Sequence, residues 1–187
     1  MLRRTWNRTP SFDLLPGLLN PDECHRLIHL SQSLPASDAR IDIGSDNVRR
    51  STTYWINRRG NEVPWLTERL GQAVDAWNES NYRFDIDDCQ DLQLTCYASG
   101  QHYDWHADLG KGESSRRKVS LVILLSARDE FTGGDLEFFS NTSQPARSTL
   151  GTGDGVIFPA WLKHRVLPVG SGTRWSLVSW WTGPPFR

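Results

Sequence analysis

The stretch VSLVILL, residues 119–125, is an unbroken run of β-branched and aliphatic residues interrupted by a single serine. A run of this length and composition is typical of a strand that is covered on both faces. Further short apolar runs follow it, separated by Gly, Pro and Asn, and no helical pattern interrupts them: GGDLEFF (133–139), GDGVIFPA (153–160), HRVLPV (164–169) and RWSLVSWW (174–181). This pattern predicts an all-β sandwich or jelly roll and not a parallel α/β sheet.

Upstream of this region the apolar residues recur with the spacing of an α-helix. Asn20 is followed by Pro21 and by Glu23, which predicts a helix start with a capping box. A second helix is predicted from about Val63 to Ser80, with Leu66, Leu70, Ala73, Val74 and Trp77 on one face. From Asp91 onward Leu92, Leu94 and Cys96 alternate with polar residues, which indicates a half-buried strand. We therefore expect one domain over 1–187, with a helical part over about 1–88 and a β core over about 89–183.

Composition limits the function classes. The formal net charge is −1, so no global basic field favours nucleic acid or an acidic membrane. We expect the local basic clusters to be mostly solvated surface: Arg49-Arg50, Arg58-Arg59 and Arg116-Arg117-Lys118. The nine tryptophans are compatible with a binding groove as well as with a core.

The cysteines and the apolar runs bear on location. Cys24, Cys89 and Cys96 are odd in number and lack metal-binding spacing, which favours a reducing, cytoplasmic environment. The first residues, MLRRTWNRTP, lack the apolar region of a secretory signal. No apolar run reaches the roughly 18 residues that a membrane helix requires, so we expect no membrane association.

Alternation along RWSLVSWW places Arg174, Ser176, Val178 and Trp180 on one face of the last strand. A charged guanidinium on a strongly apolar strand has two explanations. Either this face is turned to solvent, or the Arg points into the core and meets an anion there, because an unpaired buried charge is costly.

The segment HYDWHADLG, residues 102–110, contains His106 and Asp108 one residue apart, and His164 opens a later strand. Two His and one Asp on neighbouring strands form a facial triad that leaves coordination positions open, the pattern of non-haem Fe(II) sites. Zn²⁺ can use the same ligands, but it does not explain an inward Arg174. Tyr103 and Trp105, of opposite parity to His106, are expected to pack the walls, and His102 and Asp104 to lie at the rim.

From roughly residue 91 to 183 the sequence resembles the Fe(II)/2-oxoglutarate oxygenases, specifically their prolyl-4-hydroxylase-like branch. The resemblance rests on the ordered set H-x-D, G-G-D-L, H-x-V-x-P-V and G-x-R, which begins at His106, Gly133, His164 and Gly172. It implies a double-stranded β-helix (jelly-roll, cupin-like) core. It also implies Fe(II) at the triad, O2 as oxidant and ascorbate as a reductant.

The resemblance further implies that Arg174 binds the distal carboxylate of 2-oxoglutarate, with Ser176 beside it and Tyr97 lining the same pocket. Where some relatives carry a Tyr to support that carboxylate, the VSLVILL strand offers only Leu124. Arg117, Trp180 and Tyr103 are candidate substrate contacts. Related halogenases lack the carboxylate ligand that Asp108 supplies here, so hydroxylation is the expected outcome.

The implied activity is hydroxylation of a carbon of an amino-acid or peptidyl, including prolyl, substrate, with release of succinate and CO2. Small molecules, peptides and protein side chains all stay open as substrates. One alternative is a nucleic-acid demethylating dioxygenase of the same superfamily. Those enzymes carry a second Arg six residues after the first, where this chain has Trp180. The other alternative is a non-enzymatic cupin-like binding protein, which the complete triad and Arg174 disfavour.

Overall fold

The computed structural model describes residues 12–43, 46–140 and 144–186. In these ranges it contains the helices α1 (Pro21–Leu30) and α2 (Pro64–Ser80) and the short 3-10 helices η1 (Ser31–Ser33) and η2 (Gly112–Arg116). The strands are β1 (Asp13–Leu15), β2 (Ser37–Ile43), β3 (Asp46–Ile56), β4 (Asp88–Cys89), β5 (Leu92–Ala98), β6 (His102–His106), β7 (Arg117–Leu124), β8 (Phe131–Gly133), β9 (Leu136–Phe138), β10 (Ala146–Arg147), β11 (Gly155–Pro159), β12 (His164–Val166) and β13 (Val169–Thr182). The prediction for MLRRTWNRTP falls on residues outside the described ones.

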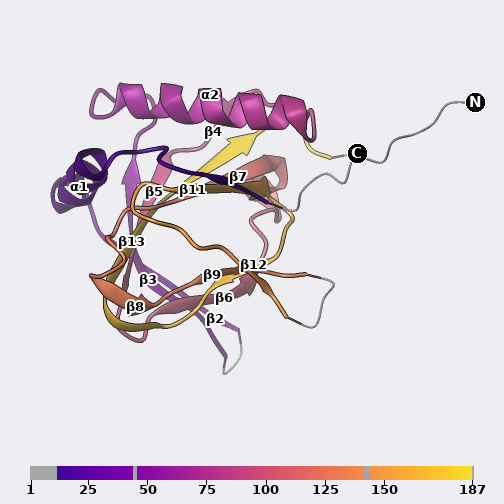
Figure 1. Cartoon of the computed structure of the whole chain (residues 1–187). Helices are drawn as coiled ribbons and strands as arrows, with labels where there is room; N and C mark the ends of the chain where they lie inside the picture. Colours follow the sequence, from indigo (N-terminus) through magenta and orange to yellow (C-terminus); the bar gives the residue numbers. More distant parts are fainter. Residues whose placement is uncertain (1–11, 44–45, 141–143, 187) are drawn as a thin grey trace, which may run out of the picture.

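The strands form one curled antiparallel sheet in the order β1-β11-β7-β13-β5-β3-β6-β12-β9-β10. Three further strands pair at its sides, β2 with β3 and both β4 and β8 with β13. Figure 1 shows the sheet folding over on itself, with β6, β9 and β12 facing the layer that contains β5, β7 and β11. The predicted fold class, mainly β with N-terminal helices, is confirmed.

Strand β7 separates two apolar clusters, which is why residues 119–125 are apolar at every position except Ser120. Leu121 and Ile123 pack with the helices, whereas Val122 and Leu124 belong to the cluster between the sheet layers. Residues of a strand point alternately to its two faces, so an apolar run is required where both faces are covered. The double coverage predicted for 119–125 is therefore confirmed.

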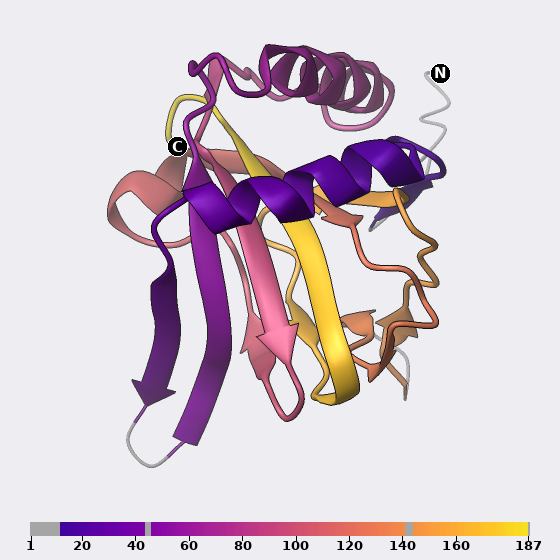
Figure 2. The same ribbon diagram turned by 90° about the vertical axis from the view of Figure 1, so that its left-hand side faces the viewer.

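Both helices cover the outer face of the sheet, and Figure 2 shows α1 crossing the strands β3, β5 and β13. Helix α1 begins as predicted, because Asn20 Oδ1 accepts from the Glu23 N–H while the Glu23 carboxylate accepts from the Asn20 N–H. Helix α2 buries Leu66, Leu70, Val74 and Trp77, so its predicted apolar face is also confirmed. No helix in the described ranges is long and apolar enough to cross a bilayer.

Two strands lie between the helices where the sequence predicted only a helical part over about 1–88. Strands β2 and β3 form a hairpin, and β3 pairs with both β5 and β6. Their sequences, SDARIDI and DNVRRSTTYWI, are polar, and the buried positions of β3 include Ser51 and Thr53. Apolar periodicity cannot detect a strand whose inward positions are hydroxyl residues. This omission matters because β3 borders the functional cavity.

Candidate functional site

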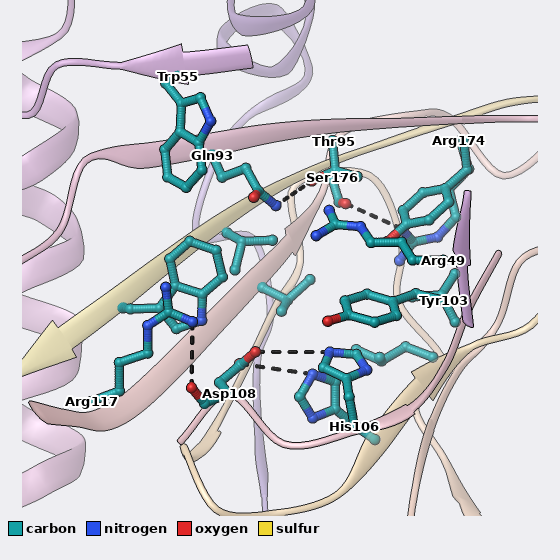
Figure 3. A pocket seen from close by; sticks show the side chains of 17 residues that line it. Arg49, Trp55, Gln93, Thr95, Tyr103, His106, Asp108, Arg117, Arg174 and Ser176 are labelled. Atoms are coloured by element: carbon teal, nitrogen blue, oxygen red, sulfur yellow. Dashed lines mark hydrogen bonds and ion pairs between the residues drawn. The ribbon is translucent and has the colours of Figure 1, made fainter. Parts of the chain in front are cut away.

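Three potential metal ligands converge where β6 meets β12. His106 ends β6, Asp108 lies two residues further on, and His164 opens β12, where it pairs with His106 in the antiparallel register. The ligand atoms of the three side chains lie within 4.8 Å of one another. Both imidazole Nε2 atoms are 3.8 Å from an Asp108 carboxylate oxygen, and Figure 3 shows the carboxylate turned toward the rings. The structure therefore brings together the triad that the sequence predicted.

Backbone carbonyls set the tautomer of both histidines. His106 Nδ1 lies 2.8 Å from the carbonyl oxygen of Asp104, and His164 Nδ1 lies 2.9 Å from that of Leu162. A carbonyl oxygen can only accept, so each Nδ1 carries the proton and donates it. Each Nε2, which lies 3.8 Å from an Asp108 carboxylate oxygen, is therefore the ring nitrogen that is available to a metal.

The charge state of the triad also suits a cation. Burial of Asp108 opposes its ionisation, but His164, His106, the Ser120 hydroxyl and Arg117 outweigh this and lower the pKa of its carboxyl. The Ser120 Oγ donates to Asp108 Oδ2 at 2.6 Å. Burial, with repulsion from His164, lowers the pKa of His106 to about 3. Two imidazole nitrogens and one carboxylate form a donor set that fits Fe(II), and also Zn²⁺.

Tyr103 lines the cavity wall as expected, but it lies on the same face as His106 and not on the opposite one. Its ring stacks on His106, with centroids 3.4 Å apart and an interplanar angle of 8°. Strict alternation would put the two residues on opposite faces, but β6 has a register shift against β12, where His164 pairs with His106 and Val166 with Tyr103. This β-bulge inserts an extra residue and returns both rings to the same face.

The other residues of this segment point elsewhere. Trp105 packs edge-on against Phe139 at 6.0 Å and under Arg165, outside the cavity, so its predicted wall position is wrong. His102 and Asp104, the predicted rim residues, contact backbone atoms and do not line the cavity.

A cavity of about 250 Å³ extends from the triad between the two layers of the sheet. At its far end lies Arg174, which is 2% exposed and donates to Ser176 Oγ at 3.2 Å. Its guanidinium lies 5.8 Å from the centre of the Tyr97 ring, and burial lowers its pKa. Among the described residues no carboxylate lies within 4.0 Å of it. A buried, unpaired guanidinium that faces a cavity is a site for an anion.

The inward face predicted for β13 is confirmed, since Arg174, Ser176, Val178 and Trp180 all line the cavity. The bend into this region depends on Gly133 and Gly134, which have positive φ angles of 68° and 63°. A Cβ on Gly134 would lie 2.9 Å from Arg174 Cδ, so glycine there leaves room for the guanidinium stem.

The polar face of β5 lines the cavity, and of its residues only Tyr97 was predicted to lie there. Gln93, Thr95 and Tyr97 are all buried, and Gln93 Nε2 donates to Thr95 Oγ1 at 2.8 Å. Burial raises the pKa of Tyr97, which Arg49 and Arg174 oppose. The parity shared by these three positions is the signal that could have identified them. Leu124 is buried but is not among the cavity-lining residues, which include Val122 of the same strand.

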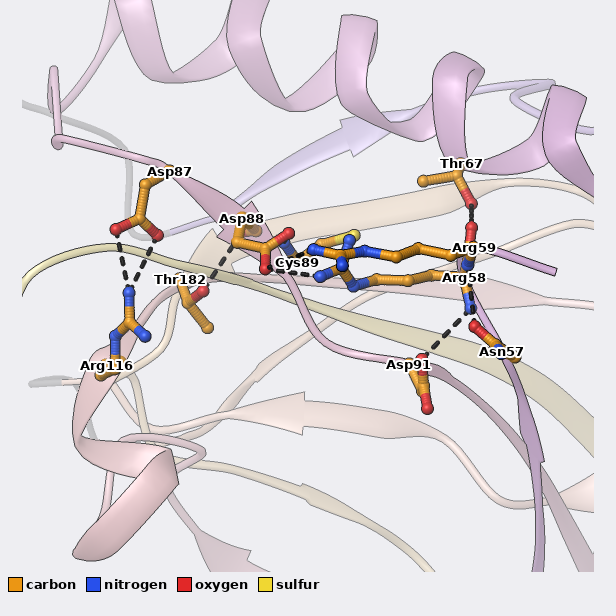
Figure 4. Close-up of polar contacts among 10 residues, drawn as sticks. All are labelled: Asn57, Arg58, Arg59, Thr67, Asp87, Asp88, Cys89, Asp91, Arg116 and Thr182. Atoms are coloured by element: carbon orange, nitrogen blue, oxygen red, sulfur yellow. Dashed lines mark hydrogen bonds and ion pairs between the residues drawn. The ribbon is translucent and has the colours of Figure 1, made fainter.

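The basic clusters divide between the surface and the cavity. Arg58, Arg59 and Arg116 form ion pairs with the surface carboxylates Asp87 and Asp88 (Figure 4). In contrast, Arg49 and Arg117 line the cavity (Figure 3) and Lys118 is buried, so the expectation of a solvated surface is wrong for these three. The position of Arg117 fits its other prediction, as a candidate substrate contact.

An aromatic and cationic group forms the side of the cavity nearest Asp108. The guanidinium of Arg117 lies 3.9 Å above the ring of Trp180. Its Nε donates to Gln90 Oε1 at 2.8 Å, and its Nη1 donates to the Asp108 carbonyl oxygen at 3.4 Å. Trp180 in turn lies 6.1 Å from Trp55, which is 43% exposed and comes from the unpredicted strand β3. The Nε1 of Trp180 is buried without a hydrogen-bond partner among the described residues.

Comparison with known proteins places this architecture in a family. The sequence model of the 2OG-Fe(II) oxygenase superfamily matches residues 92–182, which contain the triad and Arg174. A PKHD-type hydroxylase from Pseudomonas fluorescens is 31% identical over 176 residues, covering 89% of this chain and 76% of that protein. The chain belongs to the 2OG-Fe(II) oxygenase superfamily.

Two further comparisons cover different fractions of this chain and of the similar proteins. PKHD-type hydroxylases from two Synechococcus strains are 34% identical over 93 residues, which is 48% of this chain and only 41% of theirs. A crystal structure of a Pseudomonas putida prolyl-4-hydroxylase superposes with a TM-score of 0.74 and 20% identity, covering 94% of both chains. This likeness confirms the predicted double-stranded β-helix core.

Proposed function

We propose that this protein hydroxylates a carbon of an amino-acid or peptidyl substrate, using Fe(II), 2-oxoglutarate and O2 and releasing succinate and CO2. The observation that carries the proposal is Arg174, a buried guanidinium without a carboxylate partner among the described residues, at the opposite end of the cavity from the triad. A dicarboxylate that binds metal at one end and a guanidinium at the other fits this arrangement.

The protein's own groups would hold the reactants. His106 Nε2, His164 Nε2 and the Asp108 carboxylate would bind the iron, and Ser120 orients Asp108. Arg174 would bind the distal carboxylate of 2-oxoglutarate with Ser176 beside it, and Tyr97 lines the same region. Iron with its co-substrate and O2 supplies the oxidation of an unactivated C–H bond. The protein residues orient the co-substrate and substrate and limit water in the cavity.

The substrate class is supported by the names of similar proteins and by the cavity wall. The relatives carry the name PKHD-type hydroxylase, and the structural neighbour is a prolyl-4-hydroxylase. Arg117, Trp180 and Tyr103 line the cavity and are the proposed substrate contacts. Trp180 occupies the position of the second Arg of nucleic-acid dioxygenases, which disfavours that alternative. A purely binding role leaves the buried triad unexplained.

Two finer predictions accompany the proposal. A reducing, cytoplasmic location is supported by Cys24, Cys89 and Cys96, which are all free thiols. Ascorbate as a reductant stays a prediction from the family resemblance. Its direct test is the number of turnovers that each iron completes with and without ascorbate.

The proposed function is tested by anaerobic reconstitution with Fe(II) and 2-oxoglutarate, followed by succinate assays in air with prolyl peptides and free amino acids. We expect succinate formation that requires both additions, with His164→Ala losing iron and turnover. Full iron content and turnover in His164→Ala would show that the triad is wrong. Demethylation of N-alkylated DNA or RNA, without stimulation by any peptide or amino acid, would support the alternative.

A further inference from the structure

The cavity contains more positive charge than the proposed cofactors require. Three guanidiniums line it, those of Arg49, Arg117 and Arg174, and among the described residues its only carboxylate is that of Asp108. An Arg side chain stays protonated in proteins. The charges of Fe(II) and 2-oxoglutarate cancel each other, so the loaded cavity would keep its excess of positive charge. Since Arg174 is assigned to the co-substrate, the unexplained cations are Arg49 and Arg117.

Arg49 is held in place on one side of the metal site. Its Nε donates to Ser51 Oγ at 2.9 Å, and its guanidinium lies 4.6 Å above the Tyr103 ring, which itself stacks on His106. The guanidinium is therefore one aromatic ring away from a metal ligand. Figure 3 shows it projecting into the cavity above Tyr103. No carboxylate in the described residues lies within 4.0 Å of it.

Arg117 approaches the triad from the other side, next to Asp108. Its Nε is occupied by Gln90, its Nη1 is shared with the Asp108 carbonyl, and its flat face lies on Trp180. Asp108 and Glu113 act on it without forming an ion pair within 4.0 Å. Arg49 comes from β3 and also opposes the raised pKa of Tyr97, the ring that Arg174 approaches at 5.8 Å, whereas Arg117 comes from β7 and lies beside Asp108.

The arginines next to Arg49 and Arg117 in the sequence differ from them in having acidic partners. Arg50, adjacent to Arg49, pairs with Asp42 at 2.7 Å, and Arg116, adjacent to Arg117, pairs with Asp87 at 2.9 Å. In both pairs the outward Arg has an acidic partner and the inward one has none. Positions with fixed guanidiniums and free N–H groups are suited to an anion from outside the chain.

We propose that the unpaired charges of Arg49 and Arg117 make the cavity a site for a second carboxylate, and that the primary substrate carries this carboxylate near the carbon that is oxidised. This inference rests on the proposed function and narrows its substrate class. It favours a free amino acid, an acidic side chain or a chain terminus over the interior of an uncharged peptide. Trp180 and Trp55 would pack against the apolar part of the same substrate.

The test uses the whole 187-residue chain and compares the binding of acids with that of their amides. The protein is loaded anaerobically with Mn(II) and saturating 2-oxoglutarate, so that Arg174 is occupied. It is then titrated with N-acetyl-L-proline, L-proline, L-leucine, L-lysine and L-glutamate, and with the α-carboxamide of each. Tryptophan fluorescence reports binding, because Trp180 and Trp55 line the cavity. We expect at least one acid to bind about 10- to 100-fold more tightly than its amide.

The variants identify the residue responsible. Arg49→Gln should remove the preference for the acid, Arg49→Lys should retain part of it, and the matched control Arg50→Gln should retain all of it. The proposal is overturned if no acid binds more tightly than its amide, or if Arg49→Gln keeps the full preference while 2-oxoglutarate still binds.

A parallel titration with 2-oxoglutarate separates the two carboxylate sources. Arg49→Gln should leave its dissociation constant within about threefold of wild type. A rise of about tenfold or more would assign Arg49 to the co-substrate and overturn the proposal. If the wild-type protein binds no 2-oxoglutarate, the proposed function fails. The comparison of acids with amides can then be repeated without 2-oxoglutarate, and it still reports whether Arg49 binds a carboxylate.

Discussion

Replacing Arg174 by Ala should weaken 2-oxoglutarate binding while leaving the fold intact. The guanidinium is 2% exposed, and its hydrogen-bond partner is the hydroxyl of Ser176. Because no carboxylate of the described residues lies within 4.0 Å, its removal breaks no ion pair. Removal also relieves the cost of an unpaired buried charge. We therefore expect the free energy of unfolding of the ligand-free variant to equal or exceed that of wild type.

The loss in affinity follows from the burial of Arg174. Removing one partner of a buried charge pair costs about 2–5 kcal/mol. Full burial favours the upper part of this range, whereas the remaining Ser176 hydroxyl keeps the loss below the maximum. A cost of about 3–4 kcal/mol corresponds to a roughly 100- to 1000-fold higher dissociation constant. Arg174→Lys should recover only part of this, because an ammonium cannot form two parallel hydrogen bonds to a carboxylate.

The assay is an anaerobic titration of the Fe(II)-loaded protein with 2-oxoglutarate, followed by the visible charge-transfer band of the complex. Arg128→Ala is the matched control, since Arg128 pairs with Asp135 at the surface and its side chain is 48% exposed. An unchanged dissociation constant in Arg174→Ala would refute the assignment of the co-substrate pocket. A similar loss in Arg128→Ala would show that the effect is not specific to the buried guanidinium.

Three further predictions concern the support of the site and the fold. Ser120→Ala removes the hydroxyl that holds Asp108 Oδ2 at 2.6 Å and should weaken Mn(II) binding by about 10- to 100-fold, and an unchanged affinity would exclude this role. Gly134→Ala adds a Cβ 2.9 Å from Arg174 Cδ and should weaken 2-oxoglutarate binding by about tenfold in the same titration, whereas wild-type affinity would show that Arg174 has room to shift. Burial opposes ionisation of Glu137, but Arg165 and Arg147 outweigh this and lower its pKa below the ordinary 4.5. Its ionised form therefore stabilises the fold above that pH, and this contribution is lost as the pH falls below it. Urea unfolding from about pH 6 to about pH 3 should show a shallower loss of stability in Glu137→Gln than in wild type, and parallel curves would contradict this.

The sequence predicted the parts of the structure in which apolar and polar residues repeat with one regular spacing. The apolar run at 119–125 has both faces buried, and the alternation along β13 puts Arg174 and Ser176 inside. The capping residues placed the start of α1 at Pro21. The triad could also be predicted, because His106 and Asp108 are adjacent and His164 opens a strand that pairs beside them.

The remaining features depend on contacts that no local pattern reveals. The buried face of β3 includes hydroxyl residues, so neither the strand nor the position of Arg49 was predicted. The bulge in β6 reverses the expected parity of Tyr103 against His106. Of the polar face of β5 only Tyr97 was assigned to the pocket, because alternation shows that two faces differ, but not which one water reaches. Gln93 and Thr95 are buried and line the cavity with it.

The most direct test of the account is a crystal structure of the protein grown anaerobically with Mn(II) and 2-oxoglutarate. We expect one metal ion bound by His106 Nε2, His164 Nε2 and the Asp108 carboxylate. We also expect 2-oxoglutarate to reach from this metal to the guanidinium of Arg174. A metal ion bound elsewhere, or 2-oxoglutarate bound without contact to Arg174, would contradict it.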